Sequence, residues 1–125
     1  MKVSKEDAEN FEKFGVKFWD YLGDETDELD ILLEKTEKGH LEEYYNEECT
    51  FYYFVISGEG SFYIDREEKK VEEGDLIVAE PGTKVYYLGD MEILLISKPS
   101  WYPEQENHVR YVDENGKTVP DEERE

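Results

Sequence analysis

Three residues of this chain belong to the types that most often carry proton transfer, metal binding or nucleophilic attack. They are two histidines, His40 and His108, and a single cysteine, Cys49. An imidazole serves as a general base or a metal ligand near neutral pH, and a thiolate is a strong nucleophile. Cys49 follows Glu47 and Glu48, whose negative charges would raise the pKa of its thiol, so we expect a packed, unreactive cysteine. A single cysteine also rules out a disulfide within the chain.

The composition limits the classes of partner. The 125 residues include 34 acidic and 14 basic ones, which gives a formal net charge of -20. Such a surface repels nucleic-acid backbones and anionic lipid, so we expect no nucleic-acid or membrane partner, and highly anionic substrates are disfavoured. The first residues lack an apolar core of signal-peptide length, and no apolar run approaches the ~20 residues of a membrane span. We therefore expect a cytoplasmic protein.

The elements that must position any site centre on residues 49–80. Residues 50–56 are β-branched and aromatic and end at a Ser-Gly-Glu-Gly sequence, which is typical of a strand that is apolar on both faces. Residues 61–65 are predicted to return antiparallel after that turn, and residues 76–79 form a third strand after a Gly-Asp turn. Three such strands within about thirty residues indicate a small antiparallel barrel.

The residues on either side are predicted to complete this barrel. Ser4 is typical of a helix cap and Phe11 and Phe14 share one helical face, so we expect a short N-terminal helix across one mouth of the barrel. Residues 29–36 fit either a helix or a strand; we favour a strand because Gly39 closes it and strands surround it. The other predicted strands are 16–22, 40–46, 83–88 and 91–97, with an edge strand at 109–112.

Two of these strands, 50–56 and 91–97, are apolar at successive positions, so both of their faces must be covered. One face should line the barrel, and the other should meet a second sheet or a partner chain, for which a homodimer is the natural solution. Residues 113–125, by contrast, are charged and contain an Asn-Gly turn signal. We expect one domain at 1–112, including the N-terminal helix, followed by an acidic, solvated or disordered tail at 113–125.

Two motifs resemble those of the cupin superfamily. The first is Val55-Ile56-Ser57-Gly58-Glu59-Gly60, and the second is Gly74-Asp75-Leu76-Ile77-Val78 followed by Pro81-Gly82. The resemblance covers about residues 42–96 and implies an all-β fold, the cupin-type antiparallel β-barrel that is also described as a double-stranded β-helix or jelly roll. Cupins include isomerases, epimerases, dioxygenases, storage proteins and sensor domains, so the resemblance implies the fold but not one function.

The same resemblance implies that the usual metal ligands are missing. In the metal-binding members of the family that this chain resembles, two histidines and a glutamate from the first motif and one histidine from the second bind the metal ion. By position, the glutamate corresponds to Phe51, the second-motif histidine to Val85, and the paired histidines fall near residues 44–47. His40 lies upstream of that pair and His108 lies near the C-terminal end among Glu104, Glu106 and Asn107, so neither aligns to the strands of the lumen. We therefore expect a barrel without metal or other cofactor.

In this register, an aromatic and polar lumen replaces the metal site. Aromatic rings stack on the apolar faces of sugars, and hydroxyl, amide and carboxylate groups bind sugar hydroxyls. The same tyrosines could instead only pack the barrel, each hydroxyl satisfied by a neighbour. The residues implied to face the cavity or its mouth, and so to bind a ligand, are Tyr45, Asn46, Phe51, Tyr53, Tyr63, Glu80, Tyr87 and Trp101.

Three functions stay open on these grounds, and the sequence singles out no catalytic residue. The first is a metal-free cupin that binds a small neutral molecule, with a carbohydrate as the leading candidate, without necessarily transforming it. The second is a metal-independent sugar isomerase or epimerase, with Glu80 as the better candidate base and Tyr45 or Tyr53 as the acid. The third is a non-catalytic dimeric scaffold or regulatory module, which explains the doubly apolar strands and asks nothing of the lumen.

Overall fold

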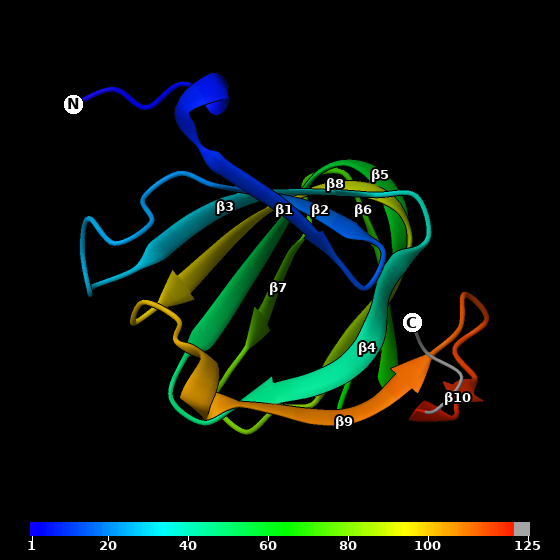
Figure 1. The fold of residues 1–125 in the computed structure, drawn as a ribbon. Coiled ribbons are helices and arrows are strands. Elements are labelled where there is room, and N and C mark those ends of the chain that lie inside the picture. The colour runs from blue at the N-terminus through cyan, green and yellow to red at the C-terminus, as the bar shows by residue number, and fades with distance from the viewer. Residues whose placement is uncertain (122–125) are drawn as a thin grey trace.

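Antiparallel strands account for almost all regular structure in the computed structural model, which describes residues 1–121 (Figure 1). Within these residues, ten strands join one hydrogen-bonded sheet that curls into a barrel, so the predicted all-β fold is confirmed. The strands are β1 (Glu9–Lys13), β2 (Val16–Asp20), β3 (Asp30–Thr36), β4 (Gly39–Asn46), β5 (Thr50–Ile64), β6 (Glu67–Glu72), β7 (Leu76–Ala79), β8 (Val85–Lys98), β9 (Glu106–Val112) and β10 (Thr118–Val119).

The two long strands, β5 and β8, form the central pair of the barrel. They run antiparallel along their whole length, from Thr50 opposite Lys98 to Ile64 opposite Val85. On its other edge β5 pairs first with β7 and then with β6, and β8 pairs first with β4 and then with β3. Because each long strand changes its outer partner near its midpoint, the sheet bends there and closes around the core.

The sequence predicted separate strands at 50–56 and 61–65 and at 83–88 and 91–97, and this division is wrong. Gly58, Gly60 and Gly89 occupy the predicted breaks. All three glycines lie inside β5 or β8. A Cβ atom on Gly58 would lie 2.2 Å from the carbonyl oxygen of Asp90, and one on Gly60 would lie 2.3 Å from that of Leu88. The glycines therefore permit a close approach of two backbones where the sheet bends. A turn and a close approach both need a residue without a side chain, so the sequence pattern is the same for both.

The predicted N-terminal helix is confined to a 3-10 turn at Lys5–Asp7. The residues after it form an antiparallel hairpin of β1 and β2, which crosses one side of the barrel in Figure 1. Phe11 and Phe18 stack across this hairpin with ring centroids 5.0 Å apart. Phe14 lies in the connecting turn with φ 54°, so its spacing from Phe11 reflects the hairpin and not a helical face.

The C-terminal part contains more regular structure than the sequence indicated. The predicted edge strand is β9, which pairs with β4 and also with β10. The predicted turn is present, since the backbone N–H of Asp113 donates to the carbonyl of Lys117 at 2.8 Å. Thr118 and Val119 then pair with β9 where we expected a solvated tail. Residues 122–125 of that predicted tail lie outside the described residues.

Apolar side chains cover both faces of the sheet at β5 and β7. The outer face leaves four large apolar residues exposed, and the homodimer that would cover them stays a prediction. The exposed residues are Phe54, Ile56, Leu76 and Val78.

Among the described residues, no helix has the length and apolar character needed to cross a membrane.

The inner face of β5 sets a test of the barrel core. Val55 is fully buried, so Val55→Asp should abolish cooperative folding, because an unpaired buried charge costs several kcal/mol. The matched control is Val78→Asp, since Val78 lies on the outer face of β7 and is 45% exposed. Thermal and urea unfolding followed by circular dichroism would compare the two. Native-like melting of Val55→Asp would show that the inner face is assigned wrongly.

Candidate functional site

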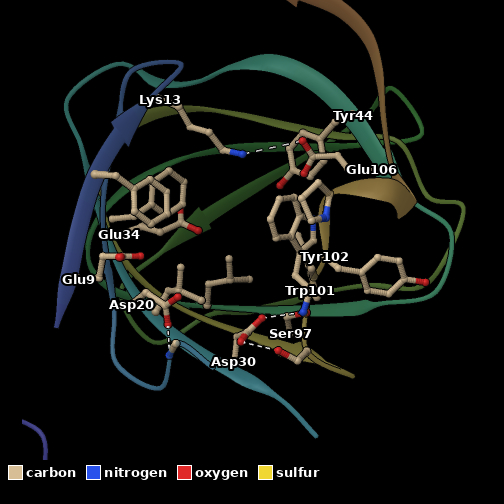
Figure 2. Close-up of a pocket in the computed structure, with 18 of the residues that line it drawn as sticks. Glu9, Lys13, Asp20, Asp30, Glu34, Tyr44, Ser97, Trp101, Tyr102 and Glu106 are labelled. Carbon is tan, nitrogen blue, oxygen red and sulfur yellow. Dashed lines mark hydrogen bonds and ion pairs between the residues drawn. The ribbon is translucent and has the colours of Figure 1, made fainter. Parts of the chain in front are cut away.

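A cavity of about 710 Å³ opens at the end of the barrel beside the β1–β2 hairpin. Its lining residues come from β1 to β5, from the loop between β2 and β3, from the end of β8 and from the chain between β8 and the start of β9, and Figure 2 shows them on opposite sides of the open space. Aromatic rings make up much of the wall, which suits flat or partly apolar ligands. These rings belong to Phe11, Phe18, Tyr44, Phe51, Trp101 and Tyr102.

The position of Trp101 in this wall is fixed by hydrogen bonds to two strands. The Asp30 carboxylate accepts a hydrogen bond from the backbone N–H of Trp101 at 2.7 Å and another from the Ser100 hydroxyl at 2.8 Å. The indole Nε1 of Trp101 donates to the Asn46 side-chain oxygen at 3.1 Å. β3 and β4 therefore hold the segment after β8 against the cavity, and the indole is positioned before any ligand arrives.

The cavity carries a strongly negative electrostatic field. Six acidic residues line it, and Lys13 is the only lysine or arginine among the described lining residues. The Lys13 ammonium lies 3.9 Å from the Glu106 carboxylate and 5.2 Å from the centroid of the Trp101 ring. Its charge is therefore largely balanced by Glu106, and the cavity does not provide the basic pocket that a phosphate group would need.

A cluster of buried polar side chains lies where the cavity meets the barrel core. We call it the polar cluster: Glu34 on β3, His40 and Tyr44 on β4, Tyr53 on β5 and Tyr87 on β8. The His40 ring packs against Tyr44 and Tyr87, with centroids 4.7 and 5.5 Å apart. The hydroxyls of Tyr44 and Tyr53 lie 2.5 Å apart, and the Tyr87 hydroxyl donates to Oε1 of Glu34. The five groups form one connected set.

One hydrogen bond of His40 shows that its Nδ1 atom carries a hydrogen. Its Nδ1 lies 2.9 Å from the backbone carbonyl oxygen of Glu42. A carbonyl oxygen only accepts, so Nδ1 carries the hydrogen, and in the neutral ring the lone pair is on Nε2. The sequence placed His40 outside the lumen, and this prediction is wrong. β4 begins at Gly39, and its first pairs bring His40 opposite Tyr87, in the interior.

Burial controls the protonation of the other members of the polar cluster. It raises the pKa of Glu34 to about 8, although the hydrogen bond from Tyr87 and the charge of Lys13 lower it in part. Glu34 is therefore a neutral carboxylic acid near pH 7. Burial also raises the pKa values of Tyr44, Tyr53 and Tyr87 well above that of a free tyrosine, so all three stay phenols that can donate hydrogen bonds.

Comparison with known proteins supplies a family for this geometry. No protein-family model matches the chain, and neither does any curated protein sequence. Among solved structures, Pac13 from Streptomyces, a nucleoside dehydratase, is 32% identical, with a TM-score of 0.88 and coverage of 92% of this chain and 95% of Pac13. The chain belongs to the same cupin family as Pac13. The cupin resemblance of its two motifs is thereby confirmed.

Further matches include other Pac13 structures and more distant cupins. Three variants of Pac13 were solved with uridine, one with a histidine replaced by glutamine and two with a tyrosine replaced by phenylalanine. KdgF from Halomonas sp. is 16% identical with a TM-score of 0.67, covering 78% of this chain and 91% of its own. Oxalate decarboxylase from Bacillus subtilis is 16% identical with a TM-score of 0.72, covering 85% of this chain and 31% of its own. The latter two share the fold alone.

Five of the eight residues predicted to bind a ligand in this cupin lie at or beside the cavity. Phe51 and Trp101 line it directly. Tyr53 and Tyr87 lie deeper, in the polar cluster, and Asn46 holds Trp101 in the wall. Their part in ligand binding stays a prediction.

The structure places the other three predicted residues away from the cavity. Tyr63 stacks on Tyr86 with centroids 4.5 Å apart, because a bulge in β5 between positions 55 and 57 shifts the alternation and turns Phe62 inward instead. Tyr45 lies on the opposite face of β4 from its buried neighbours. Glu80 is exposed in the turn after β7, so it is not the buried base that the epimerase hypothesis needed.

Sequence reasoning missed Glu34 as a member of this site. The signal was present, because Glu34 shares a face of β3 with Asp30, Leu32 and Thr36, and an acid in an apolar strand is unusual. What the sequence could not provide was the neighbour that makes this acid significant, the Tyr87 hydroxyl. Among the described residues, no group of three or more metal-ligating side chains is arranged to hold an ion.

The raised pKa of Glu34 predicts a stability effect that depends on pH. A carboxyl that ionises at about 4.5 when unfolded and about 8 when folded contributes stability that is complete at acidic pH and lost as the pH rises to about 8. Relative to the wild type, Glu34→Gln should therefore gain stability across this range, by at most about 1.4 kcal/mol per pH unit. Urea unfolding of both proteins at several pH values measures the difference.

The control for this prediction is Glu43→Gln. Burial raises the pKa of Glu43, but hydrogen bonds and charges from Arg66 and Arg110 lower it overall. The pKa shift of Glu43 is therefore opposite in direction to that of Glu34. Glu43→Gln should lose stability relative to the wild type, and the loss should grow as the pH rises from acid values. If the free energy of unfolding changed with pH in the same way for Glu34→Gln and the wild type, this result would contradict the neutral state of Glu34.

Proposed function

We propose that this cupin binds an uncharged nucleoside in its cavity and eliminates water from it. The observation that carries the proposal is a shared spacing. The three Pac13 variants solved with uridine replace a histidine, a tyrosine 13 residues further along, and a tyrosine 34 residues after that one. This chain has the same residue types at the same intervals in His40, Tyr53 and Tyr87.

The arrangement of these three residues supports the proposal independently of the spacing. They come from three strands, yet the ring centroids of His40 and Tyr87 lie 5.5 Å apart and those of Tyr53 and Tyr87 lie 5.6 Å apart. His40 also lines the cavity. A barrel that only packed its tyrosines would not need a histidine between the cavity and buried hydroxyls, so the scaffold hypothesis leaves this cluster unexplained.

The polar cluster contains the groups that elimination of water requires. A base removes a proton from carbon, a C–O bond breaks on the neighbouring carbon, a double bond forms, and the leaving hydroxyl departs as water after it receives a proton. With the hydrogen on Nδ1, the Nε2 atom of an unprotonated His40 can take the first proton. The phenol of Tyr53, with Tyr44 donating to it, can donate a hydrogen bond to an oxygen atom on which negative charge develops, while the phenol of Tyr87 donates to Oε1 of Glu34. The C–H bond is acidic enough only beside a carbonyl group.

The charge and the aromatic wall of the cavity indicate the substrate class. A nucleoside offers a flat base that can stack on Trp101 or Phe11 and a sugar whose hydroxyls can reach the polar cluster. The acidic lining and the pairing of Lys13 with Glu106 disfavour an added phosphate. The proposal therefore refines the expected carbohydrate ligand to the ribose of a nucleoside.

Uridine is the first probe of binding. A saturating concentration, a hundred times the dissociation constant, should stabilise the folded chain by about 2.7 kcal/mol, and uridine 5′-monophosphate at the same concentration should stabilise it far less. Calorimetric titration and thermal unfolding measure both. Tyr63→Phe, on the outside of the barrel, should bind uridine as the wild type does. Equal binding of the nucleoside and its phosphate would contradict the assigned substrate class.

Catalysis needs a separate test with nucleosides and their oxidised, carbonyl-bearing derivatives. Mass spectrometry should detect a product that has lost one water. His40→Gln should lower the rate by about 10²–10⁴-fold, the usual contribution of a general base, while uridine still binds. Tyr63→Phe again serves as the control with an unchanged rate. An unchanged rate in His40→Gln, or no dehydrated product from any of the nucleosides and oxidised derivatives tested, would contradict the proposal.

A further inference from the structure

We propose that Glu34 is a neutral carboxylic acid that donates a hydrogen bond from Oε2 to a ribose hydroxyl of the bound nucleoside, the hydroxyl that leaves as water. This inference rests on the proposed function and deepens it, because it names the group on this chain that contacts the departing oxygen. It assigns to Glu34 a role beyond those of the histidine and the two tyrosines that share the spacing of the Pac13 variants.

The first support is the unequal use of the two carboxyl oxygens. Oε1 accepts the hydrogen bond from the Tyr87 hydroxyl, whereas Oε2 is buried and has no hydrogen-bond partner within residues 1–121. The Glu34 side chain is only 1% exposed, yet it belongs to the lining of the cavity. A buried polar atom without a partner is costly, and a ligand hydroxyl would remove that cost. Figure 2 shows Glu34 on one side of the cavity, facing Trp101 and Tyr102 on the other.

The second support is the set of groups that face Glu34 from the neighbouring strands. Tyr87 on β8 donates a hydrogen bond to Glu34. Tyr44 on β4 and Tyr53 on β5 are neutral phenols, and a negative charge on Glu34 would raise their pKa values further. The lysine that acts on it, Lys13 on β1, also lies near Glu106. His40 on β4 lines the same cavity and packs against Tyr87. No arginine or lysine within the described residues forms an ion pair with Glu34, so burial keeps its carboxyl protonated.

A protonated Glu34 completes the proton balance of the elimination. His40 Nε2 takes one proton from carbon, and Oε2 of Glu34 gives one proton to the hydroxyl whose C–O bond breaks. The two electrons of the C–H bond form the double bond, and those of the C–O bond leave with the oxygen of water. After the product leaves, the His40 imidazolium gives up its proton and the Glu34 carboxylate takes one back by exchange with solvent in the cavity that both residues line. The net reaction releases one water and needs no other reactant.

Glu42 provides a matched comparison within the same chain. Burial raises its pKa as well, and its Oε1 likewise has no partner among the described residues. Its Oε2, however, lies 2.8 Å from Nδ1 of His108, and Glu42 is not among the residues that line the cavity. Glu42→Gln therefore reports what the loss of a buried carboxyl does without any contact to the ligand.

The first experiment compares uridine affinity at different pH values by calorimetric titration. In the wild type, affinity should fall about tenfold between pH 7 and pH 9, as Glu34 ionises around pH 8. Glu34→Gln keeps an uncharged donor at every pH, so it should bind like the wild type at pH 7 and keep its affinity at pH 9, apart from any effect of uridine's own ionisation. Glu42→Gln should follow the wild-type curve. Identical curves for the wild type and Glu34→Gln would overturn the inference.

The second experiment identifies the hydroxyl with uridine, 2′-deoxyuridine and 3′-deoxyuridine. The wild type should bind one deoxy analogue about three- to tenfold more weakly than uridine, the usual effect of one hydrogen bond. Glu34→Leu, which has no donor, should bind that analogue and uridine equally. An undiminished preference in Glu34→Leu would overturn the inference, and if this variant does not fold, the Glu34→Gln pH comparison decides. Absence of uridine binding by the wild type would overturn the proposed function and this inference together.

Discussion

The antiparallel pairing of β5 with β8 is the constraint on which the rest of the structure depends. Their backbones approach so closely at Gly58, Gly60 and Gly89 that a Cβ atom would collide with the opposite strand. This approach lets both strands bend without interruption, so that β3, β4 and β5 all pair with different stretches or edges of β8. Residues far apart in the sequence thereby surround Tyr87, a β8 residue at the centre of the polar cluster. Any side chain larger than glycine at the bend would change the geometry of the site as well as that of the fold.

Burying the polar cluster is unfavourable for stability, and its members reduce that cost by staying uncharged. Glu34 retains its proton because solvation of a carboxylate is lost in the core, and the three tyrosines retain theirs for the same reason. Elsewhere the chain buries a charged acid differently. The fully enclosed Glu43 side chain receives hydrogen bonds from Arg66 and Arg110 at 3.1 and 2.7 Å. The contrast separates an acid held by an ion-pair network from an acid left neutral beside a cavity, which is the pattern expected of a functional group.

The relation to Pac13 differs in kind from the relation to more distant cupins. KdgF and oxalate decarboxylase share the barrel at 16% identity, so the likeness to them extends to the fold alone. Pac13, at 32% identity, is similar over nearly the whole length of both chains. The inferred chemistry of this chain rests on that shared spacing of a histidine and two tyrosines together with the local geometry. Its acidic cavity and overall charge of -20 are the reasons for proposing an uncharged ligand.

By itself, the sequence determined the all-β cupin fold and the location of Phe51 and Trp101 beside the cavity, because these depend on local alternation and on motifs with a fixed register. For the same reason the strands predicted at 16–22, 29–36 and 76–79 are present, the first two with slightly shorter bounds of 16–20 and 30–36. It could not decide whether a glycine marks a turn or a close approach, since both need a residue without a side chain, so β5 and β8 were each divided in two. Only the tertiary structure decided that a bulge turns Phe62 inward in place of Tyr63. Pairing between distant strands also decided that His40 and Glu34 meet at Tyr87. Protonation and contact at the site arise from that long-range pairing, and no short stretch of sequence contains it.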